Sequence, residues 1–246
     1  STTRLWSAEL KRTGEAGGDA AGTAAIFAGD LNGDGAHELA VGAPNHNASG
    51  NYEGAVYLVS GPDEGTDALS GSAGIWIGEA GGDLVGTSLG AAGDLNSDGY
   101  DDLLVGAPGH DGAGDEAGAA YVLLGPATGS HDFSSAAARL DGEGVEDFAG
   151  RAVAGLGDLN DDGFLDVCVG APGQDSGGSE AGAAYLLLGP LTGTLSLSDA
   201  EAVTHGTAEG AALGDTLQGA DDLTADGRPD VLIGAPGAGA GSVSLI

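Results

Sequence analysis

Oxygen-bearing side chains recur at alternate positions in one short segment of the chain, GDLNGDGAHEL, which begins at Gly29. A loop that wraps around a hard cation takes ligands from alternate residues, adds a backbone carbonyl at its seventh position, and needs a glycine at its sixth for the sharp turn. The predicted ligands of this first loop are Asp30, Asn32, Asp34, the carbonyl of Ala36, and Glu38. Because the ligand positions hold no Cys or His, the segment predicts a calcium site, with magnesium as the weaker alternative to calcium.

The same segment returns three times, and the first acidic residues of the four copies are 64 residues apart. The second copy supplies Asp94, Asn96, Asp98, the carbonyl of Tyr100, and Asp102. The third supplies Asp158, Asn160, Asp162, the carbonyl of Phe164, and Asp166. The fourth supplies Asp222, Thr224, Asp226, the carbonyl of Arg228, and Asp230. Thr224 replaces the asparagine of the other copies, so we expect this site to be weaker and predict three to four calcium ions per chain.

Two other interpretations of these loops were considered. An EF-hand needs a bidentate Glu at its twelfth position, where the four copies carry Val41, Val105, Val169 and Ile233. An isolated DxNxDG segment can also be a polar hairpin turn that binds nothing. Four copies in phase, each keeping an acid at the ninth position, favour metal binding over a plain turn.

Net charge excludes several classes of partner. The 246-residue chain has a formal net charge of −32, which would repel nucleic acids and anionic lipids. No apolar run approaches the roughly 20 residues that cross a bilayer, so we expect no membrane insertion. Millimolar calcium is found outside cells, and the loops therefore predict an extracellular, secreted or cell-surface protein.

Each repeat also carries a regular series of apolar segments, which predicts an all-β fold. Residues 38–42, 102–106, 166–170 and 230–234 are short apolar runs typical of strands buried on both faces, and each leads into Gly-Ala-Pro. Each repeat is therefore expected to have four strands. The first precedes the calcium loop, the apolar run is the second, a segment such as AVYLV is the third, and a looser segment is the fourth. Four short strands make one propeller blade. The expected repeats of a single domain are residues 14–77, 78–141, 142–205, and 206–246 together with 1–13.

The two ends of the sequence complement each other in this scheme. The last repeat reaches only its third strand, whereas residues 8–13 form an extra fourth strand with no blade before it. We therefore expect this N-terminal strand to join the last blade and close a four-bladed ring, which would hide the sheet edges. The alternatives are half of an eight-bladed ring made by two chains, or a fragment of a longer propeller.

The repeated GDLNGDG segment followed by Gly-Ala-Pro resembles the FG-GAP repeats of integrin α-chain propellers and their bacterial relatives. The resemblance covers essentially the whole chain. It implies a propeller whose calcium loop joins the first two strands of each blade, and a role in adhesion or ligand binding. Two features depart from the family: four repeats cannot make its usual seven blades, and the aromatic residue of Phe-Gly is replaced in Ala21-Gly22, Val85-Gly86, Ala149-Gly150 and Leu213-Gly214.

No catalytic set emerges, so we do not expect an enzyme. The histidines do not recur with a nucleophile, and all five are interpreted as solvated surface residues: His37, His46, His110, His131 and His205. Cys168 lies in an apolar strand segment and is interpreted as a buried, inert thiol.

The sequence favours a calcium-binding module that holds a protein or glycan ligand with its variable loops. These loops run over residues 46–53, 110–116 and 174–180 and differ between repeats that otherwise match. A structural scaffold that associates with other copies of itself is the alternative, and a possible homo-oligomer follows from it. A lectin is less favoured, because Trp6 and Trp76 are too few to provide a stacking platform in each blade.

Overall fold

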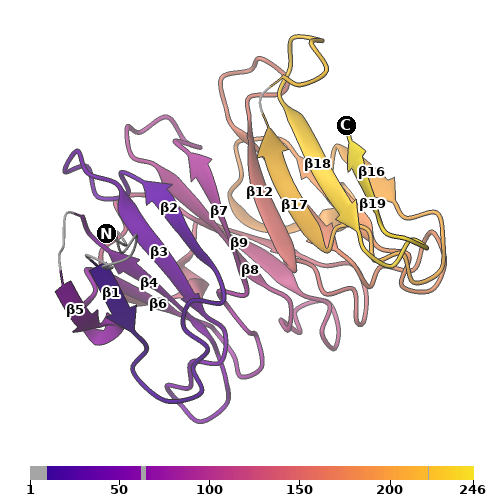
Figure 1. The fold of residues 1–246 in the computed structure, drawn as a ribbon. Coiled ribbons are helices and arrows are strands. Elements are labelled where there is room, and N and C mark those ends of the chain that lie inside the picture. The colour runs from indigo at the N-terminus through magenta and orange to yellow at the C-terminus, as the bar shows by residue number, and fades with distance from the viewer. Residues whose placement is uncertain (1–9, 62–64, 221) are drawn as a thin grey trace, which may run out of the picture.

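The computed structural model of the protein describes residues 10–61, 65–220 and 222–246, and they form β-strands, turns and three short 3-10 helices. The strands make four sheets that follow one another in chain order, together with a short two-stranded ribbon (Figure 1). The predicted all-β class is confirmed. No helix among these residues has the length and apolar character that crossing a bilayer would require.

Each of the first three repeats supplies an antiparallel sheet of four strands, as predicted. The first strands are β2 (Ala25–Gly29), β7 (Ser88–Gly93), β12 (Ala152–Gly157) and β17 (Thr216–Ala220). The second strands are β3 (Glu38–Ala43), β8 (Asp102–Ala107), β13 (Asp166–Ala171) and β18 (Asp230–Ala235). The third strands are β4 (Ala55–Val59), β9 (Ala119–Leu123), β14 (Ala183–Leu187) and β19 (Ser242–Leu245). The fourth strands are β6 (Gly74–Ile77), β11 (Ala138–Asp141) and β16 (Ala202–His205), so the described part of blade 4 has three strands.

The hairpins fix where the predicted loops lie. In every blade the acidic loop connects the first strand to the second, and the Gly-Ala-Pro loop connects the second to the third. Because these strands are antiparallel, the two kinds of loop lie at opposite ends of a blade. The acidic loops therefore gather at one end of the molecule and the variable loops at the other.

Neighbouring blades pack through the glycine of Gly-Ala-Pro. A Cβ on Gly106 would lie 1.9 Å from the carbonyl oxygen of Gly150 in the next blade, and the equivalent distances at Gly42 and Gly170 are both 2.0 Å. The residues in the place of the family's Phe are buried at these junctions: Val85, Ala149 and Leu213. Each forms an isolated parallel bridge to the preceding blade, as in Gly118 with Ala149. The two halves of the repeat motif thus form the contact between successive blades.

A second set of short strands links the blades at the rim. β10 (Gly129–Asp132) pairs in parallel with β6 of the preceding blade, and β15 (Gly193–Ser196) pairs in the same way with β11. One turn of 3-10 helix follows each of these strands, at Phe133–Ser135 and Leu197–Asp199, and a third, Leu69–Gly71, follows the equivalent strand β5 (Gly65–Ala68) of the first blade. The sequence analysis did not anticipate these rim strands.

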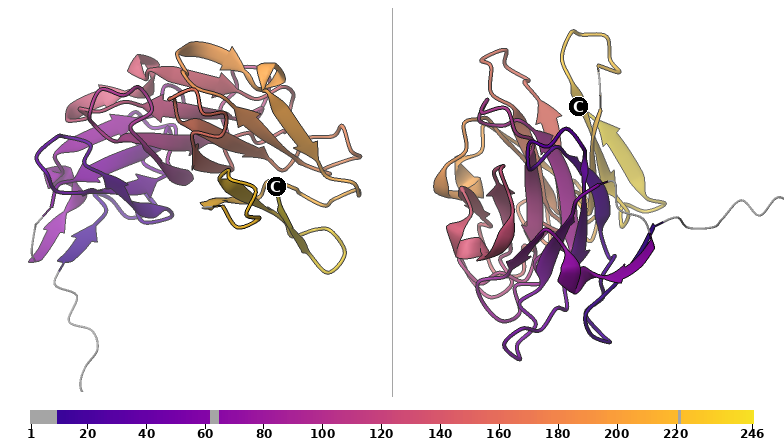
Figure 2. Two further views of the ribbon diagram at one scale, coloured as in Figure 1. Left: turned by 90° about the horizontal axis from the view of Figure 1, so that it is seen from above. Right: turned by 90° about the vertical axis from the view of Figure 1, so that its left-hand side faces the viewer.

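The predicted pairing of the N-terminal strand with the last blade is wrong for the residues that the structure describes. β1 (Leu10–Thr13) pairs in parallel with β5 (Gly65–Ala68) of the first blade, with Leu10 opposite Gly65, and residues 8 and 9 of the predicted strand lie outside the described part. Gly74 stands opposite Gly129 and Ala138 opposite Gly193 in the later blades. Leu10, Gly74 and Ala138 are spaced by 64 residues, and so are their partners. β1 therefore occupies the place of the fourth strand of a preceding blade, and it pairs with the rim strand β5 instead of β19. The array is an open arc (Figure 2).

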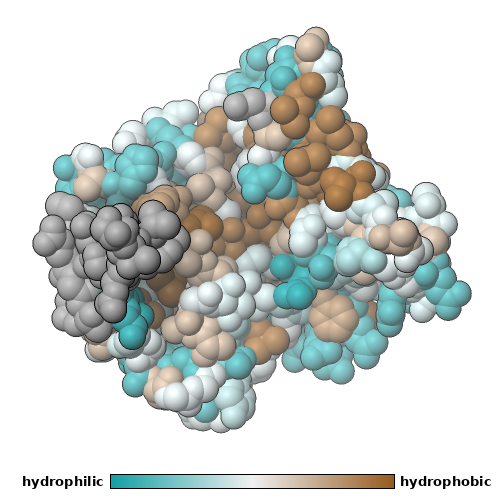
Figure 3. Space-filling model, viewed as in Figure 1, coloured by the Kyte–Doolittle hydropathy of each residue, from teal (hydrophilic) through white to brown (hydrophobic). Residues whose placement is uncertain are grey.

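The core is built mainly from the second and third strands. All six residues of β8 and all five of β9 are buried, as expected for strands covered on both faces. Tyr57, Tyr121 and Tyr185 occupy equivalent positions in the third strands and are at most 1% exposed. In blade 4 the third strand is exposed instead, with Val243 71% and Leu245 42% accessible. Apolar side chains gather over the C-terminal sheet on the face seen in Figure 3.

Candidate metal loops

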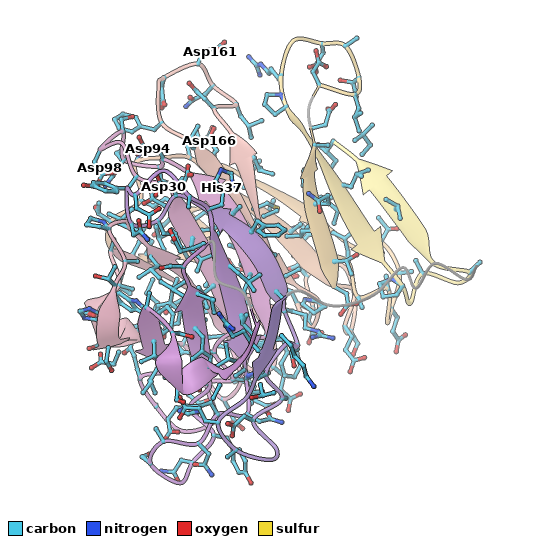
Figure 4. All side chains as sticks on the ribbon, turned by 60° about the vertical axis from the view of Figure 1, so that its left-hand side comes forward. Asp30, His37, Asp94, Asp98, Asp161 and Asp166 are labelled. Carbon is cyan, nitrogen blue, oxygen red and sulfur yellow. The ribbon has the colours of Figure 1, made fainter. Side chains whose placement is uncertain are left out.

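The four acidic loops share one backbone conformation. Their fourth residues all have left-handed φ values, 77° at Gly33, 60° at Ser97, 59° at Asp161 and 59° at Ala225. The sixth residue is Gly in each loop, with φ from 88° to 95° at Gly35, Gly99, Gly163 and Gly227. A left-handed conformation at the sixth position is what the predicted turn required. The labelled residues of the first three loops lie together at one end of the molecule (Figure 4).

The first acid of every loop turns inward and accepts hydrogen bonds from the loop's own backbone. Asp94 accepts from the N–H groups of Asp98 and Gly99, at 3.0 and 2.9 Å. Asp30, Asp158 and Asp222 make the same two bonds, to Asp34 and Gly35, Asp162 and Gly163, and Asp226 and Gly227. These bonds hold the loop curled around the first carboxylate. Each oxygen of Asp94, Asp158 and Asp222 accepts one of these bonds and can still bind a cation. In Asp30 only Oδ2 can do so, because Oδ1 also accepts from the N–H of Gly33 at 2.7 Å.

The ninth residue stands at the start of the second strand and is buried. Asp102 accepts from the N–H of Leu95 at 2.7 Å and from that of Gly125 at 2.9 Å, and it is 0% exposed. Burial raises the pKa of Asp102 to about 6, and the nearby carboxylates of Asp98 and Asp94 add to the rise. Asp166 has the equivalent two bonds, to Leu159 and Gly189, and burial raises its pKa as well. A cation would relieve this accumulation of negative charge.

The first loop holds a longer acid at the ninth position. Glu38 is 1% exposed, and its Oε1 atom accepts from the side-chain amide of Asn32 at 2.8 Å. Its Oε2 atom is buried without a hydrogen-bond partner. Burial raises the pKa of Glu38, and the carboxylates of Asp34 and Asp30 add to the rise, while backbone N–H groups of Leu31 and Asn32 oppose it. A buried, unsatisfied carboxylate oxygen beside two other acids is the feature of this loop that best fits a bound cation.

The fourth loop differs where its sequence differs. Asp230 accepts from the backbone N–H of Thr224 at 2.8 Å, and the Thr224 hydroxyl approaches the other oxygen of Asp230 at 3.3 Å. The corresponding Asn96 and Asn160 instead point their amides at Asp98 and Asp162, at 2.9 and 2.8 Å. Thr224 therefore lies beside the ninth-position acid and offers one hydroxyl where the other loops offer a carboxamide.

The donor set of the loops fits calcium, although the acids are not drawn into a tight cluster. Among the residues described, no three His, Cys, Asp or Glu side chains are gathered closely enough to hold a metal ion as they stand. The first and ninth acids are each held by a different set of backbone amides: Asp94 accepts from Asp98 and Gly99, and Asp102 from Leu95 and Gly125. Oxygen donors at alternate positions, together with the unsatisfied Glu38 oxygen, still match what Ca²⁺ requires.

The opposite end of the blades carries buried polar clusters that the sequence analysis missed. The interpretation of all histidines as surface residues is wrong for His46 and His110, which are 8% and 7% exposed. His110 Nδ1 lies 3.1 Å from Asp83, and His46 Nδ1 lies 3.1 Å from the Tyr57 hydroxyl. His37, His131 and His205 are exposed, as expected.

In each of the first three blades, a buried polar cluster fixes the first residue of the variable loop by hydrogen bonds. Gln174, the equivalent residue in blade 3, is also buried and bonds to Ser176, while Tyr185 donates to Glu143 at 2.7 Å. The 64-residue spacing could have revealed these clusters, because three kinds of residue recur with it: the first residue of the variable loop, the Tyr of the third strand, and the Asp of the GEAGGD-type turn. The exposed parts of the variable loops are therefore shorter than predicted and begin after His46, His110 and Gln174.

Cys168 is buried and free, and burial raises its pKa to about 12, as expected for an unreactive thiol.

A family model for the FG-GAP repeat matches the chain four times, over residues 21–59, 85–123, 149–187 and 213–246, which together make up more than half of it. The chain belongs to the FG-GAP repeat family. Each match starts at the residue in the place of the family's Phe, which at Val85, Ala149 and Leu213 is buried between blades. The first three matches end with the third strand, so they span both the acidic loop and the Gly-Ala-Pro junction.

Integrin α-chains are among the relatives of this FG-GAP protein. It is 36% identical to integrin alpha-5 of Xenopus laevis over 158 residues, 37% identical to integrin alpha-IIb of Mus musculus over 150, and 35% identical to integrin alpha-V of Gallus gallus over 159. These alignments cover 58–60% of this chain and 14% of each relative. The chain thus matches about a seventh of the length of these proteins, and the likeness confirms an integrin-like FG-GAP propeller fold.

Proposed function

We propose that this FG-GAP protein is a calcium-stabilised binding module. The observation that carries the proposal is the conformation shared by the four acidic loops, in which an inward first acid and a left-handed glycine surround a set of oxygen donors. The proposed ligands are the residues named for each loop in the sequence analysis. Loops 1 to 3 would each bind one ion, and loop 4, with Thr224, would bind more weakly, which gives three to four ions per chain.

Calcium would act on stability by neutralising carboxylates that the fold brings together. The proposed ligands of each loop include three acids, and burial already disfavours the charged forms of Glu38, Asp102 and Asp166. At about 1 mM calcium and a dissociation constant of ~10 μM, each occupied site would stabilise the fold by about 2.7 kcal/mol. Such a concentration is typical of the extracellular space, where we place the protein.

Ligand contacts would come from the exposed parts of the variable loops at the end away from the metal loops. Tyr52, in the first of these loops, is a large hydrophobic residue that is 56% exposed. The backbone that carries each tip is fixed by the buried His46, His110 or Gln174. A rigid base below a variable tip suits recognition of a protein or glycan ligand in adhesion, the role that the resemblance to integrin α-chains implies. We propose no enzymatic activity.

The calcium proposal is tested by isothermal titration calorimetry of the chain against Ca²⁺. The Asp98→Ala variant removes a central acid of loop 2 and should lower the stoichiometry by one ion. Asp132→Ala is the matched control, because Asp132 is an exposed acid outside the loops, and it should leave the stoichiometry unchanged. Absence of calcium binding by the unmodified chain would refute the proposal.

A scaffold that associates with other copies is the second candidate. The exposed apolar residues of the last blade favour it, since Val243 and Ile246 are 71% and 54% accessible where the equivalent Ala184 and Leu187 are 3% and 5% accessible. Sedimentation equilibrium decides: a strictly monomeric chain would count against self-association. A lectin role has less support, because Trp76 is buried and Trp6 lies outside the described residues.

A further inference from the structure

Metal loops 1 and 2 are joined by a pair of hydrogen bonds between blades. The backbone N–H of Asp30 donates to Oδ2 of Asp101 at 2.7 Å, and the backbone N–H of Asp101 donates to the carbonyl oxygen of Asp30 at 3.2 Å. Asp30 is the first acid of loop 1. Asp101 stands between Tyr100 and Asp102, two of the proposed ligands of loop 2, but belongs to neither ligand set itself. A residue of one loop thus holds the backbone of a ligand in the other.

Loop 1 has glycines where loop 2 docks on it. A Cβ on Gly29 would lie 2.2 Å from a carboxylate oxygen of Asp101, and a Cβ on Gly33 would lie 2.4 Å from the ring of Tyr100. At the position of Gly33, loops 2 and 3 carry Ser97 and Asp161. Figure 4 shows Asp30, Asp94 and Asp98 at the same end of the molecule, where these loops lie.

The other neighbouring loops do not share this connection. The residues equivalent to Asp101 are Leu165 in loop 3 and Pro229 in loop 4. Leu165 can only pack its methyl groups toward Gly93, and Pro229 near Gly157 has no N–H to donate. Within the residues described, the reciprocal bond between loops is therefore specific to the first two blades.

We propose that Asp101 couples cation binding at loops 1 and 2, so that calcium in either loop raises the affinity of the other. The inference rests on the proposed calcium function. A cation in loop 2 would fix the Tyr100 carbonyl and the Asp102 carboxylate and so fix Asp101 between them. Asp101 would then hold the backbone of Asp30 in place before loop 1 binds its ion. The second ion would therefore bind to a loop that is already ordered, with a smaller loss of conformational entropy.

The first cation weakens the electrostatic attraction of the pair of loops for the second, so the ordering effect of Asp101 must exceed this opposing effect. The two loops together contain seven carboxylates: Asp30, Asp34, Glu38, Asp94, Asp98, Asp101 and Asp102. Two calcium ions bring four positive charges, so the pair of loops stays negative after both have bound. The second cation therefore still approaches a net negative site.

Calorimetry on a chain with loops 3 and 4 silenced by Asp162→Ala and Asp226→Ala isolates the coupled pair. We define the coupling factor as the ratio of the calcium affinity of one loop when the other is occupied to its affinity when the other is empty. We expect two ions to bind with a coupling factor of at least about 5. Asp101→Leu gives loop 2 the residue found in loop 3 and should reduce the factor to about one. Asp101→Asn keeps an oxygen that can accept from Asp30 and should retain most of the coupling.

Asp101→Ala repeats the test if the leucine variant does not fold, as judged by circular dichroism. A coupling factor of one in the silenced parent chain, or an unchanged factor in both the leucine and alanine variants, would overturn the inference while the calcium sites remain established. If the unmodified chain and the silenced parent bind no calcium, the proposed function fails, and the coupling fails with it. The two failures are therefore distinguishable.

Discussion

Blades 2 and 4 share the FG-GAP pattern but differ in what covers them and in their third strands. Blade 2 lies between two neighbours, and all five residues of its third strand are buried. Within the described part of the chain blade 4 has a neighbouring blade on one side, and its third strand β19 is mostly exposed. The same FG-GAP pattern therefore yields a rigid unit in one place and a loosely covered sheet in the other. Stability in this fold depends on the junctions between blades as much as on the blade sequence, as in other repeat proteins.

The largest expected difference concerns one leucine of the second strand. Leu104 is fully buried, whereas the equivalent Leu232 is partly exposed. We expect Leu104→Ala to lower the free energy of unfolding by about 2–5 kcal/mol, because it leaves a cavity that surrounding blades cannot fill. Leu232→Ala should cost less than half as much. Urea denaturation of the two variants provides the comparison, and equal losses would show that blade 4 is as well packed as blade 2.

The junction glycine gives a second, smaller contrast. Gly106→Ala would place a methyl group against the carbonyl of Gly150 in the next blade, and moving a backbone should cost about 1–3 kcal/mol. Gly234 is the equivalent residue in blade 4, and its closest neighbour is the side-chain oxygen of Thr216 in the same blade. Gly234→Ala should therefore have little effect on the midpoint of thermal unfolding. A similar loss in both variants would argue that the glycine serves its own strand and not the junction.

The smallest effect concerns the buried polar cluster at the base of the variable loop of blade 2. The hydrogen bond to Asp83 raises the pKa of His110 against the opposing effect of burial and of Arg139, and Asp141 adds to the rise. Because the folded pKa exceeds the unfolded value of about 6.5, this stabilisation is complete below pH 6.5 and is lost as the pH rises through the folded pKa.

His110→Gln introduces the residue that blade 3 carries at this position, and it should remove that part of the pH dependence. Chemical denaturation at several pH values between 6 and 8 provides the measurement. A pH dependence that is the same in the variant would place its origin elsewhere.

Local features of the fold could be predicted, and features that depend on contacts between blades could not. The second strand of blade 2 was expected over residues 102–106 and is found at Asp102–Ala107, because a short apolar run bounded by Gly-Ala-Pro is a local signal. The rim strand Gly129–Asp132 is polar and exposed, and its partner belongs to the preceding blade, so no local pattern marks it.

The candidate site divides in the same way. The turn at Gly99 follows from the type and spacing of its residues. The link from Asp101 to Asp30 depends on how two blades meet and could not be predicted. The place of β1 was misjudged for a related reason: complementary strands predict that a pairing is available, but not which of two edges takes it.

The central claim is that calcium bound in the acidic loops stabilises the fold. Its most direct test is the thermal unfolding of the chain in 1 mM calcium and after chelation, with the bound metal measured on the same sample. With three sites each contributing about 2.7 kcal/mol, we predict three to four ions per chain and a midpoint lowered by roughly 15–30 °C on chelation. A chain that holds no calcium and unfolds at the same temperature in both conditions would contradict the account.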